Sequence, residues 1–178
     1  MVSETKWLLK ATREHSHVFN LPIKHEKGII ASDGYRMHVV GEFPDKSLKI
    51  FESDTPSFWE AIPKTKSISE VMIDNLTIKE RFNDFKIYAK HRSNIVKLSI
   101  KDRELIGNID EITFSLGFVQ TIKGTEKDFD VWINFSFLFD AVNINKIKQS
   151  MIETRLNDEV IVIKTSAYTS YIMPIRRG

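Results

Sequence analysis

The sequence predicts an α+β fold made of repeated strand-helix-strand-strand-strand units. In the C-terminal part, a short strand at 130–133 precedes a segment with Phe135, Leu138 and Val142 on one helical face, and alternating strands follow. A helix followed by strands also begins near the N-terminus, and the stretch between 67 and 119 is almost entirely β in pattern. Helices and antiparallel strands that share a core in this order are typical of the α+β class.

The N-terminal segment predicts a helix with one apolar face. Ser3 is a residue type that caps helices, and Trp7, Leu8 and Ala11 fall on one side of a helix over 5–14. The other side carries cations, which on an isolated helix indicate a solvated surface.

A β-hairpin follows this helix. Strands are expected at 18–23, 28–32 and 35–40, and a turn at 25–28 joins the first two. Asp33-Gly34 is the best short-range hairpin signal in the chain, because Gly tolerates positive φ and Asp favours turns. The residue types of this segment demand a tight turn and nothing more.

The middle of the chain predicts a second helix and then a β-rich stretch. After a short strand at 47–51, Ser53 or Asp54 begins a helix that has Pro56 in its first turn and ends at Pro63. Alternating apolar residues between Asn and Asp turns then predict strands at 71–73, 76–82, 85–90, 95–100 and 112–116, before a polar loop at 121–128. A helix over 75–85 is the alternative in this stretch, but the segment alternates better than it follows helical spacing.

Residues 134–178 predict one helix and three strands. Asn134 or Ser136 caps the helix whose apolar face was described above. Strands at 150–157 and 159–165 follow, with the turn at Asn157-Asp158. A last strand ends at Pro174, where backbone pairing stops on that side.

The composition is that of an ordinary soluble globular protein. Of the 178 residues, 42% are hydrophobic and 28% are charged, which is too apolar for a disordered chain. A net charge of +2 does not describe a polycation that binds nucleic acid by bulk charge. The absence of cysteine excludes disulfides and thiolate metal sites. Without a long apolar run or a signal-peptide pattern in residues 1–6, a cytoplasmic protein is expected.

Two motifs resemble the bacterial DNA polymerase III sliding clamp, the β subunit. The helix start Asn134 to Asp140 and the ending Met173-Pro174-Ile175-Arg176 look like the end of that protein. The stretch Ala31-Ser32-Asp33-Gly34-Tyr35-Arg36-Met37 resembles the Ala-Thr-Asp-Gly-His-Arg-Leu signature of the clamp's middle domain. Both motifs occur in the family's order, and together the matches cover about a third of the chain well.

The resemblance implies a compact or divergent clamp, with antiparallel sheets outside and helices inside a ring. Residues 1–92 would resemble the family's middle domain, and 93–178 its C-terminal domain without the first helix. The alternative is one domain over 1–178 with an insertion. The implied function is a DNA processivity factor that encircles duplex DNA as a homo-oligomeric ring and binds polymerase peptide motifs.

The resemblance also implies two sets of site residues. A positive inner surface would contact phosphates without reading bases; its candidates are Lys6, Lys10, Arg13, Lys146 and Lys148. A concave apolar pocket would take the apolar end of a partner peptide; its candidates are Gly34, Tyr35, Met37, Tyr171, Met173, Pro174, Ile175 and Arg176. Two departures affect this pocket, since Tyr35 replaces the family's usual histidine and the chain ends Arg177-Gly178 instead of in leucine.

Four other functions compete with this one. The chain has no Gly-rich phosphate loop and no nucleophile motif, so no enzymatic activity and no cofactor are expected. His15 and His17 invite a metal site, but alternate residues of a strand diverge and further ligands are missing, so a plain surface is expected. The 11% aromatic content would suit a single-strand binder, yet most rings fall on predicted buried faces. A clamp-fold regulator of replication that encircles nothing remains a rival.

Overall fold

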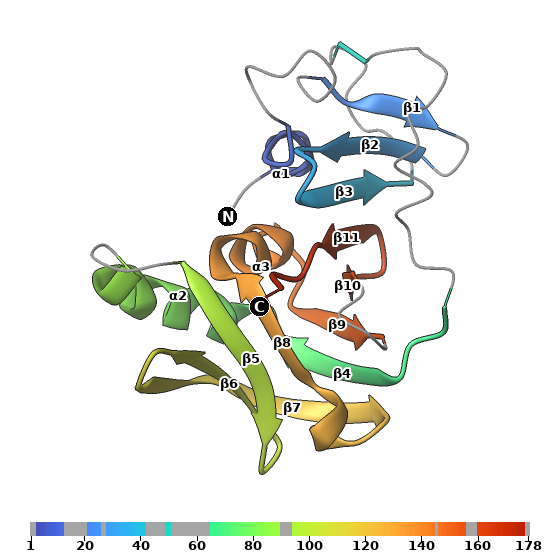
Figure 1. The fold of residues 1–178 in the computed structure, drawn as a ribbon. Coiled ribbons are helices and arrows are strands. Elements are labelled where there is room, and N and C mark those ends of the chain that lie inside the picture. The colour runs from blue at the N-terminus through green and yellow to red at the C-terminus, as the bar shows by residue number, and fades with distance from the viewer. Residues whose placement is uncertain are drawn as a thin grey trace.

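A computed structural model of the 178-residue chain describes residues 3–12, 21–25, 28–41, 49–50, 65–89, 94–144, 146–155 and 160–176. Within these residues three α-helices and one 3-10 turn accompany eleven strands (Figure 1). The helices are α1 (Glu4–Leu9), α2 (Asn75–Ala89) and α3 (Phe135–Val142), and the 3-10 turn η2 is Glu126–Asp128. The strands are β1 (Ile23–His25), β2 (Gly28–Ser32), β3 (Arg36–Val40), β4 (Ser69–Asp74), β5 (Ile95–Lys101), β6 (Glu104–Ile109), β7 (Ile112–Lys123), β8 (Asp130–Asn134), β9 (Gln149–Thr154), β10 (Ile161–Lys164) and β11 (Tyr168–Ile172).

All eleven strands belong to one antiparallel sheet. Their order is β1-β2-β3-β11-β10-β9-β4-β7-β6-β5-β8. In chain order, β4-α2-β5-β6-β7 and β8-α3-β9-β10-β11 are two successive strand-helix-strand-strand-strand units. The predicted α+β class and its repeated units are therefore confirmed.

The main hydrophobic core lies between the helix pair α2 and α3 and the strands of both halves of the sheet. Phe135, at the start of α3, is fully buried against Phe82 and Phe85 of α2. The same hydrophobic cluster includes Val96 from β5 and Ile163 from β10. Strands from both halves of the sheet therefore pack against α2 and α3. Figure 1 shows α2 and α3 beside each other along one side of the sheet.

Helix α3 begins where the sequence predicts. The side-chain oxygen of Asn134 accepts a hydrogen bond from the Ser136 backbone amide at 3.0 Å, which satisfies one of the free donors at the helix start. Phe135, Leu138 and Val142 are buried, as their spacing predicts. The hairpin of β2 and β3 around Asp33-Gly34 is confirmed as well.

The strands expected at 76–82 and 85–90 are wrong, because Asn75–Ala89 forms helix α2. Asp74, which reads as a turn residue, caps this helix by accepting hydrogen bonds from the amide and hydroxyl of Thr77, both at 2.7 Å. Ile78, Phe82 and Phe85 then form a buried helical stripe. The cap and the stripe together outweigh the local alternation of polar and apolar residues.

Other boundaries also differ from the predictions. Helix α1 is shorter than 5–14, strand β6 was not expected, and β7 extends three residues into the predicted polar loop. The turn before β6 is built on Asp102 and Arg103, both at positive φ, so it carries no glycine signal. The strand at 47–51 and the helix after Ser53 lie mostly or wholly outside the described residues. No helix in the described part of the chain is long and apolar enough to cross a bilayer.

Candidate binding site where the hairpin turn meets the C-terminal tail

Strands β3 and β11 bring the hairpin turn and the C-terminal tail together. They pair antiparallel, with Ile172 opposite Arg36 and Tyr171 opposite Met37. Just beyond the strands, the Met173 amide donates a hydrogen bond to the Tyr35 carbonyl at 2.9 Å. The two motifs that resemble the clamp are thus neighbours in space, although more than 130 residues separate Tyr35 from Met173 in the sequence.

A small cavity of about 60 Å³ lies at this meeting point. Gly34, Met37, Tyr171 and Met173 of the predicted pocket line it, and the sequence reading missed its other lining residues, which are Ser32, Arg36 and Val160. The remaining predicted residues do not line it: Tyr35 is 61% exposed at the turn, and Pro174, Ile175 and Arg176 continue the tail.

The tail beyond the cavity lies against the edge strand β8. The Ile175 amide donates a hydrogen bond to the Trp132 carbonyl at 2.8 Å. Met173 is 43% exposed, and its flexible thioether lies beside the apolar wall of the cavity. Shape and chemistry therefore fit a small apolar side chain of a ligand.

The hairpin turn is fixed by its own side chains. One oxygen of Asp33, Oδ1, accepts hydrogen bonds from the backbone amides of Tyr35 and Arg36, each at 2.9 Å. Gly34 has φ +88°, a conformation that favours glycine. The second oxygen, Oδ2, accepts a hydrogen bond from Arg36 Nε at 3.0 Å, so the turn also holds the guanidinium group of Arg36.

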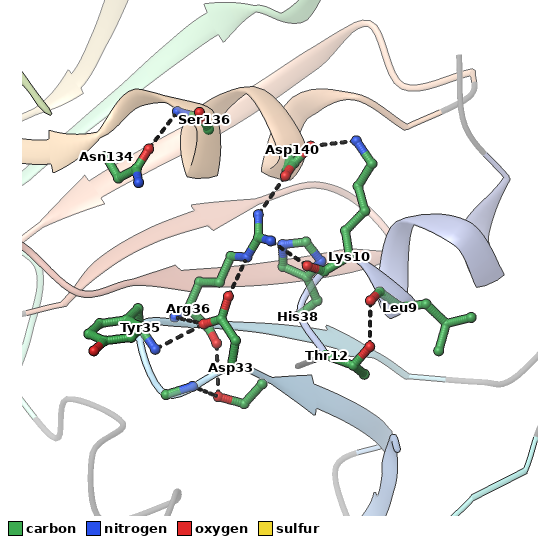
Figure 2. Close-up of polar contacts among 12 residues, drawn as sticks. Leu9, Lys10, Thr12, Asp33, Tyr35, Arg36, His38, Asn134, Ser136 and Asp140 are labelled. Atoms are coloured by element: carbon green, nitrogen blue, oxygen red, sulfur yellow. Dashed lines mark hydrogen bonds and ion pairs between the residues drawn. The ribbon is translucent and has the colours of Figure 1, made fainter. Parts of the chain in front are cut away.

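Arg36 links this turn to helix α3 and to the end of α1 (Figure 2). Its Nη1 donates to Oδ2 of Asp140 on α3, and its Nη2 donates to the carbonyl of Lys10. The Lys10 ammonium donates to Oδ1 of the same Asp140. The guanidinium also lies 4.5 Å from the ring centroid of Phe137. Asp140 is therefore a carboxylate shared by two cations from two different elements.

A buried histidine lies behind this ion network. His38 is fully buried, with its ring stacked on Trp7 at 4.1 Å between centroids. Its Nδ1 lies 2.9 Å from the Trp7 carbonyl, which can only accept, so Nδ1 carries the proton. Burial lowers the pKa of His38 to about 3, with further lowering from the nearby Arg36 charge. The imidazole is therefore neutral near pH 7.

The polar contacts of Trp7 join the N-terminal elements to the C-terminal helix. Trp7 Nε1 donates a hydrogen bond to the Ala141 carbonyl at 3.3 Å. Sequence reasoning did not single out His38, or Trp7 as a polar contact, and it used Asp140 only as part of a motif. The positions of Arg36 and Asp140 inside the two family-like motifs were the available signal, but nothing in the sequence pairs them.

The cations predicted to face DNA have different surroundings. Lys6, Lys146 and Lys148 are exposed, Lys10 is bound to Asp140, and Arg13 lies outside the described residues. Ile144 belongs to the same hydrophobic cluster as Trp7 and Leu8, and Ile147 packs against that cluster. The segment that carries Lys146 and Lys148 therefore packs beside α1.

Lys79 of α2 is a cation near Ile144 that the sequence reading missed. Its ammonium donates to the Ile144 carbonyl at 3.5 Å, and burial lowers the pKa of the group, against the opposing charge of Asp74. Because a strand was expected at 76–82, Lys79 was not placed on a helix and was not among the predicted cations.

Comparison with solved structures identifies the fold. A scan against protein-family models finds no match, and no curated protein matches the sequence. Solved structures of DNA polymerase III β subunits, in contrast, match almost the whole chain. A sliding clamp from Bartonella birtlesii bound to griselimycin matches with a TM-score of 0.73 and 13% identity over 98% of this chain. The chain has a sliding-clamp fold.

Two further clamps give the same result. The Pseudomonas aeruginosa sliding clamp matches with a TM-score of 0.72 and 12% identity over 99% of this chain. The Helicobacter pylori β clamp, solved bound to a DNA ligase peptide, matches with a TM-score of 0.68 and 13% identity over 96%. The resemblance stated from the two motifs is confirmed at the level of the clamp fold.

The chain is shorter than the clamps it resembles. It spans 64%, 66% and 62% of the B. birtlesii, P. aeruginosa and H. pylori chains, and 42% of the β subunit from Thermotoga maritima, where the match covers 84% of this chain with a TM-score of 0.58.

Proposed function

We propose that this protein is a clamp-like processivity factor that encircles duplex DNA as a homo-oligomeric ring and binds polymerase or other replication proteins through a short peptide. The observation that carries the proposal is the pairing of β3 with β11, which builds an apolar cavity from the two clamp-like motifs. A concave apolar site with a few fixed polar groups is the usual form of a site for a short ligand. The H. pylori clamp bound to a DNA ligase peptide supports the same class of partner.

A peptide titration tests the cavity directly. A fluorescein-labelled hexapeptide ending in Leu-Phe should bind the wild-type chain, and Met173→Ala should weaken it by about tenfold, as the loss of an apolar contact in the cavity does. Tyr35→Ala should weaken it less, because Tyr35 is exposed at the turn and does not line the cavity. Met151→Ala is the matched control, because Met151 is a partly buried methionine on β9 that does not line the cavity. No binding by the wild-type chain would refute the peptide role.

The DNA interface is proposed on the lysines around α1. Contacts of this kind follow the phosphates and leave base identity unread, which permits sliding. The residues are Lys6, Lys79, Lys146 and Lys148, together with the predicted Lys10 and Arg13.

Salt dependence tests that interface. Replacing the three exposed lysines Lys6, Lys146 and Lys148 with alanine should reduce the slope of log K against log salt concentration by roughly 2.7, at roughly 0.9 for each lost phosphate contact. The matched control removes three exposed cations near the β5–β6 turn, Lys101, Arg103 and Lys127. An unchanged slope in the first variant, or an equal loss in the control, would rule out the surface around α1.

The domain division remains a proposal. The pairing of β4 with β7 and β9, and the packing of α2 on α3, favour a boundary before Ser69 over the predicted one at residue 92. Helix α2 then supplies the first helix that the C-terminal domain was expected to lack. The N-terminal domain would consist of α1, β1, β2 and β3 with the residues between them and Ser69.

A regulator that has the clamp fold but encircles nothing is the second candidate. One observation favours it: Asp140 neutralises Lys10, one of the cations predicted to face DNA. Mass measured in solution with and without circular duplex DNA decides between the two, because a chain that stays monomeric cannot close a ring.

A further inference from the structure

We propose that Asp140 couples the lysine surface around α1 to the apolar cavity, so that a phosphate group bound by Lys10 strengthens the hold of Arg36 on the hairpin turn and raises peptide affinity. This inference rests on the proposed function and adds a regulatory link between its two sites. It follows from one shared carboxylate and its two competing cations.

The cavity depends on Arg36 from two directions. The arginine lies at the cavity wall, and its Nε is bound to Asp33, the residue that shapes the turn carrying Gly34. On the other side, its Nη1 is bound to Asp140 on α3. With 11% of its side chain exposed, Arg36 is held in place by these partners and transmits any change at Asp140 to the turn.

Lys10 competes with Arg36 for the charge of Asp140. Each cation takes one oxygen of the carboxylate, and the two positive charges also repel each other. A carboxylate shared in this way attracts each partner less than it would attract that partner alone. The Arg36 contact is therefore weaker while Lys10 is present than it would be in its absence.

Lys10 is the member of the network that an outside anion can reach. Its side chain is 30% exposed, against 17% for Asp140 and 11% for Arg36, and it sits on a long flexible stem. Lys6 on the same helix is exposed and attracts phosphate to this region. A DNA phosphate that draws Lys10 away leaves Asp140 to Arg36 alone.

The expected coupling is small and measurable. Partly exposed ion pairs change an equilibrium by about two- to fivefold. Duplex DNA should therefore raise the affinity of the labelled hexapeptide for the wild-type chain by about two- to fivefold at low salt. By thermodynamic reciprocity, the peptide should raise DNA affinity by the same factor.

The experiment compares peptide affinity with and without a short duplex in the wild-type chain and in three variants. Lys10→Met keeps the aliphatic stem and removes the competing cation, so its peptide affinity should already be raised without DNA and should not respond to DNA. Asp140→Asn should lower peptide affinity and also show no response. Lys101→Met is the matched control, since Lys101 is exposed at the end of β5 and lies outside the proposed DNA interface, and it should keep the coupling.

A second readout follows Arg36 itself. Exchange of the Arg36 Nε proton with water, measured by NMR, should slow when DNA is added to the wild-type chain and should not change in Lys10→Met. If DNA and peptide both bind but neither peptide affinity nor this exchange rate responds to DNA, the coupling is refuted and the proposed function stands. If no peptide binds, the peptide role is refuted, and the exchange rate of the Arg36 Nε proton alone decides the coupling. If no DNA binds, the proposed DNA-binding function and the coupling are both refuted.

Discussion

Replacing His38 tests the polar junction between the N-terminal elements and α3. His38 is completely buried, and its Nε2 has no hydrogen-bond partner among the described residues. Desolvation is the largest cause of its lowered pKa; the charges of Arg36 and Lys10 act in the same direction, whereas the Trp7 carbonyl and Asp140 act against it. Protonating this imidazole therefore favours unfolding.

The size of the effect follows from the two pKa values. In the unfolded chain the imidazole titrates near 6.5, and in the folded chain near 3. Between these pH values the unfolded state binds about one more proton, so the free energy of unfolding falls as the pH falls. The contribution is fully present above pH 6.5, and at pH 5 about 2 kcal/mol of it is lost, at about 1.36 kcal/mol per pH unit.

Urea unfolding at pH 8, 6 and 5 measures this loss in the wild-type chain and in His38→Gln. Glutamine keeps a donor for the Trp7 carbonyl and removes the titrating group. The carboxylates common to both chains affect both curves, so the difference between the curves isolates His38. We expect the variant to be less stable at pH 8 and to lose about 2 kcal/mol less than wild type between pH 8 and pH 5. Equal losses in the two chains would refute the buried, neutral state of His38.

Two further substitutions test how the helices are held. Asp74→Ala removes the cap of α2 and should lower the free energy of unfolding by about 1 kcal/mol, measured by urea unfolding, whereas Asp84→Ala on the exposed side of the same helix should change it by less than about 0.5 kcal/mol. Phe135→Ala empties the centre of the aromatic cluster and should cost about 3–5 kcal/mol; a loss below about 1 kcal/mol would mean that α2 and α3 do not pack through this ring.

Local signals account for the parts of the fold that could be read from the sequence. The Asn134 side chain caps α3 by accepting a hydrogen bond from the Ser136 amide, two residues along the chain. The Asp33 side chain fixes the hairpin turn in the same way, through the Tyr35 amide. Helix α2 was misread because its interior alternates, and because Asp74 serves equally well as a turn residue and as a cap. The packing of Phe82 and Phe85 on Phe135 of α3 adds to the cap in favour of the helix, and that packing is not local.

The candidate site was predictable only in part, for the same reason. The family-like motifs name Gly34, Met37, Tyr171 and Met173, and these residues do line the cavity. The resemblance includes Asp140 in a motif but could not supply its role, because that role depends on a contact across 104 residues of sequence. Lys10 is the clearest example of what the sequence leaves out. Its position predicts a free cation on a helix, yet its ammonium group is paired with Asp140, a carboxylate from another helix.

The cavity exists only while the N-terminal elements and the last strand remain joined. Its walls include residues of β3 and β11, and the same junction buries Trp7 and His38 and shares Asp140 between two cations. Separating the two parts would expose the Trp7 ring and leave Asp140 without either partner, which is costly for a largely buried carboxylate. Peptide binding should therefore be lost together with the junction, and a chain cut between β3 and β4 should bind the hexapeptide only if its two pieces stay associated.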